Sequence, residues 1–257
     1  MLFGVAEGVY SLSQEQQEFY RSKGYLILEK LFSEEECGTI LKSVRQHANE
    51  DFAPIMNPDR EEELGRQAPF SSTEKVRETA TLLRNFMKNP RSVSILETLQ
   101  GKEVVGLMSQ MLFKEVGTRY ALQAWNPHQD NTYARNLNQQ YLTTNLFLAD
   151  ADKENGGLYI YPGSHREGLL PAAPTVSYRE PRGQKPGNPV KLPTGYKKVD
   201  LVFRKGDFIV LHGDCVHGSY ANTSKTRSRP LYSCSYLTKG EAFLPGNNAK
   251  RMVILLH

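Results

Sequence analysis

From Val104 onward, short runs of aliphatic and aromatic residues alternate with turn-forming residues, and this texture restricts the fold more than any other feature of the chain. Each run has the length and composition of a strand and is bounded by residues such as Gly, Pro, Asn or Asp. A succession of short strands without long helices between them favours an antiparallel sandwich or jelly roll. We therefore predict an all-β core with flanking helices, with strands near residues 104–113, 120–126, 142–149, 157–162, 199–203, 207–212 and 230–238.

The region before this core, residues 1–103, is predicted to be rich in helix. Ser13 and Ser33 each begin a capping box, because Gln or Glu follows three residues later. Asn89-Pro90 supplies a cap and a first-turn proline for a later helix. The remaining elements expected here are a short strand at 25–28, a surface connection at 51–73, and helices at about 74–88 and 90–101.

A length of 257 residues fits a single domain that comprises the helix-rich region and a β core over 104–257. Residues 163–198 interrupt the strand pattern, since they contain six prolines and little apolar periodicity. A long insertion of this kind is more often a lid or a binding loop than a structural part of a domain.

Composition excludes several classes of protein. The formal net charge is +4, which is too small to indicate binding to nucleic acid. No apolar run is long enough for a membrane span, and no Lys or Arg precedes Arg21, so we expect neither a membrane protein nor a secretory signal. The three cysteines form no metal-type pair and are expected to be free thiols in the cytoplasm. The sequence leaves the oligomeric state open.

Three residues have the spacing of a metal site. His128 and Asp130 are two residues apart, and on an extended chain both side chains point to the same face. His217 follows a late strand and is a suitable third ligand. Two histidines and one carboxylate form the facial triad of non-haem Fe(II) oxygenases. Each residue alone has a plainer interpretation, a surface turn or a strand-end histidine, and only the combination favours the metal.

Arg227 and Arg229 follow His217 by ten and twelve residues and lead into the last strand. A guanidinium beside a metal site would bind the distal carboxylate of an α-keto acid through two hydrogen bonds. A solvated basic loop is the plainer interpretation of either arginine.

Four motifs together resemble the phytanoyl-CoA dioxygenase family of Fe(II)/2-oxoglutarate-dependent oxygenases. They are P-H-Q-D (127–130), E-N-G-G-L-Y-I-Y-P-G-S-H (154–165), G-D-F-I-V-L-H-G-D-C-V-H-G-S (206–219) and N-T-S-K-T-R-S-R (222–229). The resemblance covers nearly the whole chain, and it implies a double-stranded β-helix of the cupin-like jelly-roll type.

The resemblance also assigns roles to individual residues. It implies that His128, Asp130 and His217 bind Fe(II), and that Arg229 binds the C5 carboxylate of 2-oxoglutarate, with Arg227 as the alternative. The residues that resemble further neighbours of the cosubstrate are Ser219, Met111 and Asn145, although Asn145 replaces the aromatic residue often found at its position.

The reaction implied is hydroxylation of a small molecule, with O₂ and 2-oxoglutarate as cosubstrates and succinate and CO₂ as products. Desaturation, cyclisation and epimerisation remain alternatives, as do a catalytically silent binding protein and a cupin-like metal isomerase. Residues 178–198 carry six basic residues and one acid, which is compatible with an anionic substrate. We expect His212 to be structural and His165 to brace the lid.

Overall fold

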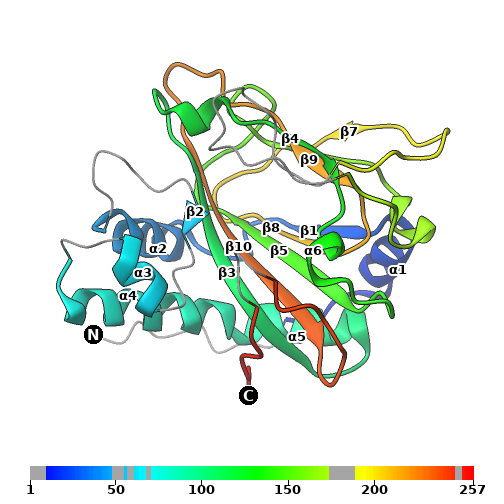
Figure 1. Ribbon diagram of the computed structural model, residues 1–257, viewed down its shortest axis with the longest axis horizontal. Helices are drawn as coiled ribbons and strands as arrows, with labels where there is room; N and C mark the ends of the chain where they lie inside the picture. The colour runs from blue at the N-terminus through cyan, green and yellow to red at the C-terminus, as the bar shows by residue number, and fades with distance from the viewer. Residues whose placement is uncertain (1–9, 48–54, 57–60, 68–70, 174–188, 247–250) are drawn as a thin grey trace.

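Two antiparallel sheets face each other across the interior of the chain (Figure 1). The structure is a computed structural model that describes residues 10–47, 55–56, 61–67, 71–173, 189–246 and 251–257. The larger sheet contains, in spatial order, β1 (Tyr25–Leu28), β8 (Phe208–His212), β5 (Tyr141–Phe147), β10 (Arg229–Thr238), β3 (Val104–Lys114) and β2 (Ile55–Met56). The smaller sheet contains β4 (Trp125–His128), β9 (His217–Ser219), β6 (Leu158–Ile160) and β7 (Val199–Asp200). This is the predicted jelly roll with flanking helices.

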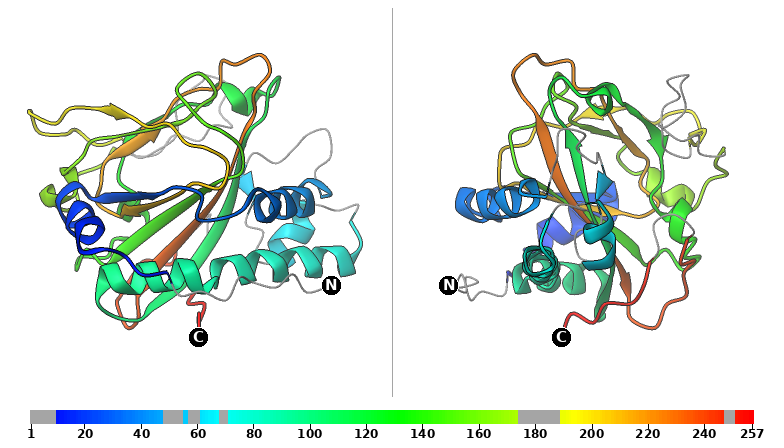
Figure 2. Two further views of the ribbon diagram at one scale, coloured as in Figure 1. Left: turned by 180° about the vertical axis from the view of Figure 1, so that it is seen from behind. Right: turned by 60° about the vertical axis from the view of Figure 1, so that its left-hand side comes forward.

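The helices lie outside the larger sheet, as Figure 2 shows from behind and from the side. They are α1 (Gln14–Lys23), α2 (Glu34–Arg45), α3 (Glu61–Gln67), α4 (Thr73–Met87) and α5 (Pro90–Gln100), with α6 (Asn131–Ala134) and the 3₁₀ turns η1 (Arg119–Leu122) and η2 (Ser164–Glu167) in the connections. The predicted caps are confirmed, because Ser13 and Ser33 both form complete capping boxes. Within the described residues, no helix combines the length and the apolar character needed to cross a membrane.

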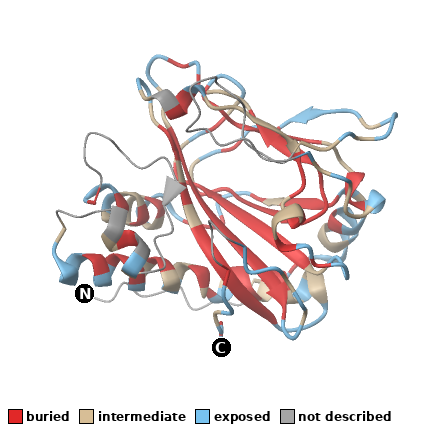
Figure 3. Cartoon of the chain, viewed as in Figure 1, coloured by how far each residue is buried: buried red, intermediate tan, exposed pale blue. Residues whose placement is uncertain are grey.

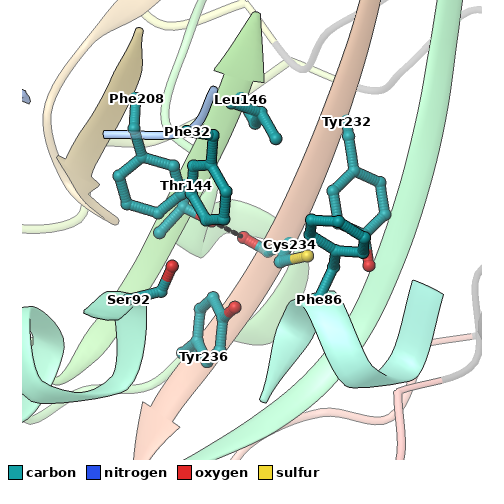
Figure 4. Close-up of a pocket in the computed structure, with 9 residues that line it drawn as sticks. All are labelled: Phe32, Phe86, Ser92, Thr144, Leu146, Phe208, Tyr232, Cys234 and Tyr236. Carbon is teal, nitrogen blue, oxygen red and sulfur yellow. Dashed lines mark hydrogen bonds between the residues drawn. The ribbon is translucent and has the colours of Figure 1, made fainter. Parts of the chain in front are cut away.

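The side chains of β10 alternate between the helices and the interior. Tyr232 and Tyr236 donate hydrogen bonds to the carbonyl oxygens of Leu83 and Met87 in α4, at 2.7 and 3.0 Å. Figure 4 shows both tyrosines with Cys234 in a small apolar pocket beneath α4 and α5. Since successive side chains point to opposite faces, the odd-numbered residues from Arg229 to Ser235 face the space between the sheets.

That space is filled at one end by apolar side chains, and the long strands of the larger sheet are buried along most of their length, whereas β7 of the smaller sheet is exposed (Figure 3). Phe147 of β5 stacks on Phe203 with ring centroids 3.7 Å apart. Leu158 and Ile160 of β6 belong to the same cluster. Burial of this apolar surface holds the sheets together and leaves the opposite end of the interior to polar residues.

Two expectations from the sequence were wrong in detail. Residues 120–126 were predicted as one strand, but Arg119–Leu122 form a 3₁₀ turn and the strand begins at Trp125. The Thr118 hydroxyl accepts a hydrogen bond from the Ala121 amide at 3.2 Å and so favours the turn. The predicted connection over 51–73 contains β2 and α3.

The predicted lid is described at its two ends, and residues 174–188 lie outside the described residues. The Ala173 amide donates to the Pro189 carbonyl at 3.0 Å, so the two ends meet. The Val190 amide donates to the carbonyl of Pro127 at 3.0 Å. The base of the insertion is therefore attached to the residue that precedes His128.

His212 has the structural role expected for it. Its ring lies 5.0 Å from the ring of His165 and 6.4 Å from that of Tyr20, measured between centroids. Its Nδ1 accepts a hydrogen bond from the Asp214 amide at 3.1 Å, which requires the neutral ring. Burial, together with the nearby His165, lowers the pKa of His212 to about 4.

The low pKa of His212 predicts a loss of stability in mild acid. Between the unfolded pKa of about 6.5 and the folded pKa of about 4, the unfolded chain binds the extra proton. The free energy of unfolding should therefore fall as pH decreases, by up to about 1.4 kcal/mol per pH unit from this residue. Denaturant titrations from pH 7 to pH 4.5 should show a shallower fall for His212→Asn. Equal slopes for both proteins would contradict this assignment.

Candidate active site

His128, Asp130 and His217 meet between the two sheets. The Nε2 atom of His128 is 3.5 Å from Asp130 Oδ1, and that of His217 is 3.6 Å from Asp130 Oδ2. One ligand atom from each residue lies within 4.8 Å of the other two. In the described part of the chain, this is the one group of three such side chains close enough to hold a metal ion.

The two histidine rings are oriented for metal binding through Nε2. The Nδ1 atom of His128 is 2.7 Å from the carbonyl oxygen of Asn126, and that of His217 is 3.0 Å from the carbonyl oxygen of Cys215. A carbonyl oxygen accepts but cannot donate, so each Nδ1 carries the proton and each Nε2 keeps its lone pair. Two imidazole nitrogens and a carboxylate suit a divalent transition metal such as iron and leave open positions for other ligands.

Asp130 reaches the histidines by a different route from the one expected. The sequence suggested that His128 and Asp130 would project from one face of an extended strand. Instead β4 ends at His128, and Asp130 has helical dihedral angles at the start of α6. The carboxylate is therefore positioned by the turn between strand and helix.

The surroundings of Asp130 keep its carboxylate ionised. Burial alone would raise the pKa of Asp130, but the neighbouring His217, His128 and Thr143 outweigh it and lower the pKa below its usual value of 3.8. Burial lowers the pKa of His217, although Asp130 opposes this effect. Asp130 is thus an anion at neutral pH, ready to bind a cation.

Gln129, between two of these residues, joins the P-H-Q-D motif to the insertion and to the motif that contains His217. Its side-chain amide donates to the carbonyls of Gly168 and Asp214, each at 2.7 Å. Its side-chain oxygen accepts from the Leu170 amide at 2.8 Å. Because Gln129 is completely buried, these bonds fix the His128–Asp130 turn against the start of the insertion and the loop before His217.

Arg229 is the buried arginine of the predicted pair. Only 2% of its surface is exposed, and burial lowers its pKa to about 10. Its Nε donates to the carbonyl of Gly156 at 3.1 Å, whereas its buried Nη1 has no hydrogen-bond partner. Buried polar groups are nearly always paired in folded proteins. The unpaired Nη1 of Arg229 therefore indicates that a ligand binds here.

Lys114 is a second buried cation beside Arg229, and the sequence analysis missed it. The two residues are directly opposite each other across β3 and β10. The Nζ of Lys114 donates to the Ser219 hydroxyl at 2.8 Å and to the carbonyl of Tyr220. Burial and the charge of Arg229 lower its pKa well below the usual value. Lys114 ends a strand of mostly apolar residues, at a position whose side chain faces the interior. That position was the sequence signal that could have identified it as a buried basic residue.

Gly156 explains part of the E-N-G-G motif. Its φ is +91°, and a Cβ at this position would lie 2.7 Å from Cδ of Lys114. Glycine is therefore needed both for the backbone conformation and for the approach of its carbonyl to Arg229. The motif therefore packs directly against the two basic side chains.

Arg227, the alternative to Arg229, binds elsewhere. Its guanidinium forms two hydrogen bonds to Asp152, at 2.8 and 3.1 Å, and one to Glu154 at 2.7 Å. Its side chain is 38% exposed. The structure therefore places Arg227 in a surface ion-pair cluster rather than beside the metal ligands.

The structure separates the two remaining predicted residues. Asn145 of β5 is opposite Ser233 of β10, on the interior face. Met111 of β3 is opposite Tyr232, and it belongs to the core beneath the helices. The structure therefore does not bring the Met111 side chain to the interior, and Gln110 faces Ser233 in its place.

The basic residues expected on the lid are only partly described. Arg179, Arg182 and Lys185 lie outside the described residues. Lys198 is 5.1 Å from the ring centroids of Tyr159 and Tyr220, a favourable arrangement of a cation above an aromatic ring.

Solved structures share this fold. The epimerase SnoN from nogalamycin biosynthesis, in complex with Fe³⁺, α-ketoglutarate and nogalamycin RO, aligns with a TM-score of 0.66 and 20% identity, over 95% of this chain and 98% of that one. The α-ketoglutarate-dependent carbocyclase SnoK from the same biosynthesis aligns with a TM-score of 0.61 and 22% identity, over 93% and 88% of the two chains. At these identities the similarity establishes the jelly roll.

Sequence comparison establishes the family. A phytanoyl-CoA dioxygenase from Arabidopsis thaliana is 26% identical over 260 residues, which cover 87% of this chain and 88% of the relative. The family model for phytanoyl-CoA dioxygenase (PhyH) matches residues 20–230, a range that includes all three residues of the metal-binding group. The chain therefore belongs to the phytanoyl-CoA dioxygenase (PhyH) family of dioxygenase enzymes.

Proposed function

We propose that this protein is an Fe(II)- and 2-oxoglutarate-dependent oxygenase that hydroxylates a small molecule. The observation that carries the proposal is the convergence of His128, Asp130 and His217, with both histidines turned to offer Nε2. An Fe(II) ion held there supplies the activation of O₂, coupled to conversion of 2-oxoglutarate to succinate and CO₂. The chain supplies the ligands, the cosubstrate pocket and a partly closed interior.

Arg229, Lys114 and Ser219 fit the distal carboxylate of 2-oxoglutarate. Ser219 follows His217 by two residues on β9, a step of about 6.6 Å along a strand. That distance is comparable with the length of a five-carbon dicarboxylate. The keto-acid end would reach the metal ligands, while the other end meets two buried cations. Asn145 is proposed to contact the cosubstrate from β5.

The buried Arg229 and Lys114 argue against a metal isomerase and against a catalytically silent binding protein. A cupin-like isomerase has no need of a buried arginine beside its metal ligands, and a protein that has lost turnover is expected to have lost a ligand or the anchor. This chain retains all of them. The cytoplasm remains the proposed compartment, since all three cysteines are free.

The mass of the product would distinguish the possible reactions. Hydroxylation adds one oxygen atom, desaturation or cyclisation removes two hydrogens, and epimerisation leaves the mass unchanged. Because the solved relatives include an epimerase and a carbocyclase, products should be examined for all of these changes.

Asp130→Ala should remove the metal-dependent activity while leaving the fold intact. Loss of the carboxylate leaves only the two histidines as ligands. It should lower 2-oxoglutarate turnover by more than about a hundredfold, because removing a group that only supports a metal ligand already costs about ten- to hundredfold. Succinate production, bound iron and circular dichroism should be measured. The exposed Asp200→Ala is the control, and full activity in Asp130→Ala would exclude that residue as a ligand.

Arg229→Gln should raise the KM for 2-oxoglutarate by about ten- to hundredfold, because a charge-assisted hydrogen bond contributes about 1.5–3 kcal/mol. Arg227→Gln is a matched control on the adjacent surface and should change KM less than twofold. Initial rates of succinate formation give both values. The reverse ranking of the two variants would assign the anchor to Arg227.

Lys114→Met should also raise this KM, by about tenfold, because it removes the second cation and the hydrogen bond to Ser219 while keeping an unbranched side chain. At saturating 2-oxoglutarate, kcat should remain close to that of the unmodified protein. An unchanged KM with a lowered melting temperature would show that Lys114 has a structural role alone.

A further inference from the structure

Arg251 is a third buried cation, far along the chain from the proposed cosubstrate pocket. It is 9% exposed, and its buried Nε has no hydrogen-bond partner. Its Nη1 donates to the carbonyl of Tyr133 at 3.2 Å. Among the described residues, no carboxylate lies within salt-bridge distance of this guanidinium. A guanidinium enclosed without an anion is costly, which indicates that an anion binds there.

One aromatic ring separates Arg251 from the metal ligands. Its guanidinium carbon is 5.9 Å from the ring centroid of Tyr133, and that ring is 6.5 Å from the ring of His128. The C-terminal segment, red in Figure 1, holds Arg251 in place by pairing with β3, where the Met252 amide donates to Leu107 O at 3.2 Å. Arg251 therefore lies near the metal-binding group, on the same side as α6.

Two further buried hydroxyl groups lie close to Asp130 and Arg251, and each contacts a neighbouring side chain. Thr143 of β5 and Ser235 of β10 are opposite each other on the interior face, and the oxygen atoms of both side chains are buried. Thr143 is close enough to Asp130 to help lower its pKa. Tyr141, two residues before Thr143, is in hydrogen-bonding contact with both Ser235 and Arg251.

We propose that Arg251, with the hydroxyls of Ser235 and Thr143, forms a site that binds a carboxylate of the primary substrate. This inference rests on the proposed function and names the class of its substrate, a small carboxylate-bearing molecule. The bound carboxylate holds the rest of the molecule beside His128 and Asp130, where oxidation occurs. Arg251 is thus a specificity-determining residue.

The position and charge of this site distinguish it from the cosubstrate pocket. Ser235 is six residues from Arg229 along β10, a separation of about 20 Å, so one small dicarboxylate cannot reach both Ser235 and Arg229. Arg251 carries a single positive charge. A carboxylate matches that one charge, whereas a phosphate dianion would add an uncompensated negative charge.

The fluorescence of Trp125 provides a direct binding assay. It is the one tryptophan of the chain, and its ring is 5.7 Å from that of His128. Benzoate, propionate and their uncharged amides should be titrated into the full-length protein, once without metal and once with Zn(II) and saturating 2-oxoglutarate. In the second arm the cosubstrate fills its own pocket.

Both carboxylates should bind at least about tenfold more tightly than their amides in both arms. Arg251→Gln should abolish this preference in the second arm, where 2-oxoglutarate already occupies Arg229 and Lys114, and should leave the affinity for 2-oxoglutarate unchanged, whereas the exposed control Arg21→Gln should keep the preference. Ser235→Ala should weaken carboxylate binding, and its melting temperature, measured alongside, reports whether the variant is folded. This second variant tests the site even if Arg251→Gln folds poorly.

Three results in the second arm would overturn the proposal: no carboxylate binding at tens of millimolar, a preference in Arg251→Gln equal to that of the unmodified protein, or full carboxylate affinity in Ser235→Ala. Failure of 2-oxoglutarate to bind in the second arm, with carboxylate binding intact in the first, would instead refute the proposed cosubstrate and leave the Arg251 site standing.

Discussion

The pairing of His128 with His217 across β4 and β9 is the contact on which the site depends. Side chains of a strand alternate between faces, so a shift of one residue in this register would turn His217 away from Asp130. Gly218 permits the close approach of these strands, because a Cβ there would lie 2.3 Å from the Tyr159 hydroxyl and 2.7 Å from the carbonyl of Trp125. Register and glycine together convert a common antiparallel pair into a metal-binding geometry.

The interior between the sheets carries positive charge at two separated places. Arg229 and Lys114 lie near Ser219, and Arg251 lies beyond Tyr133. Burying a cation without a partner costs several kcal/mol, and no described carboxylate pairs with any of the three. We infer that these buried cations lower the free energy of unfolding of the free protein, and that anionic ligands restore it when they bind. The proposed cosubstrate and substrate would then be held on either side of the metal, which fixes the orientation of the reacting carbon.

Much of this could be predicted from the sequence, for identifiable physical reasons. Capping boxes and strand periodicity are local signals, so the helices after Ser13 and Ser33 and most strands of the core were correct. The three metal-binding residues could be recognised because each lies in a short stretch of characteristic sequence. The face on which Met111 lies depends on strand register, which is not a local property, and its assignment was therefore not supported. Lys114 and Arg251 were missed because long-range folding, rather than a motif, removes them from solvent.

The central claim is that the chain binds Fe(II) through His128, Asp130 and His217 and then binds 2-oxoglutarate against Arg229. The most direct test is an anaerobic titration of the metal-free protein with Fe(II), followed by 2-oxoglutarate, while visible absorption is recorded. The account predicts a metal-to-ligand charge-transfer band that requires both additions, is absent in Asp130→Ala, and decays on exposure to O₂ as succinate forms. Iron binding without a band on addition of 2-oxoglutarate would contradict the cosubstrate assignment, and failure to bind iron would contradict the metal site itself.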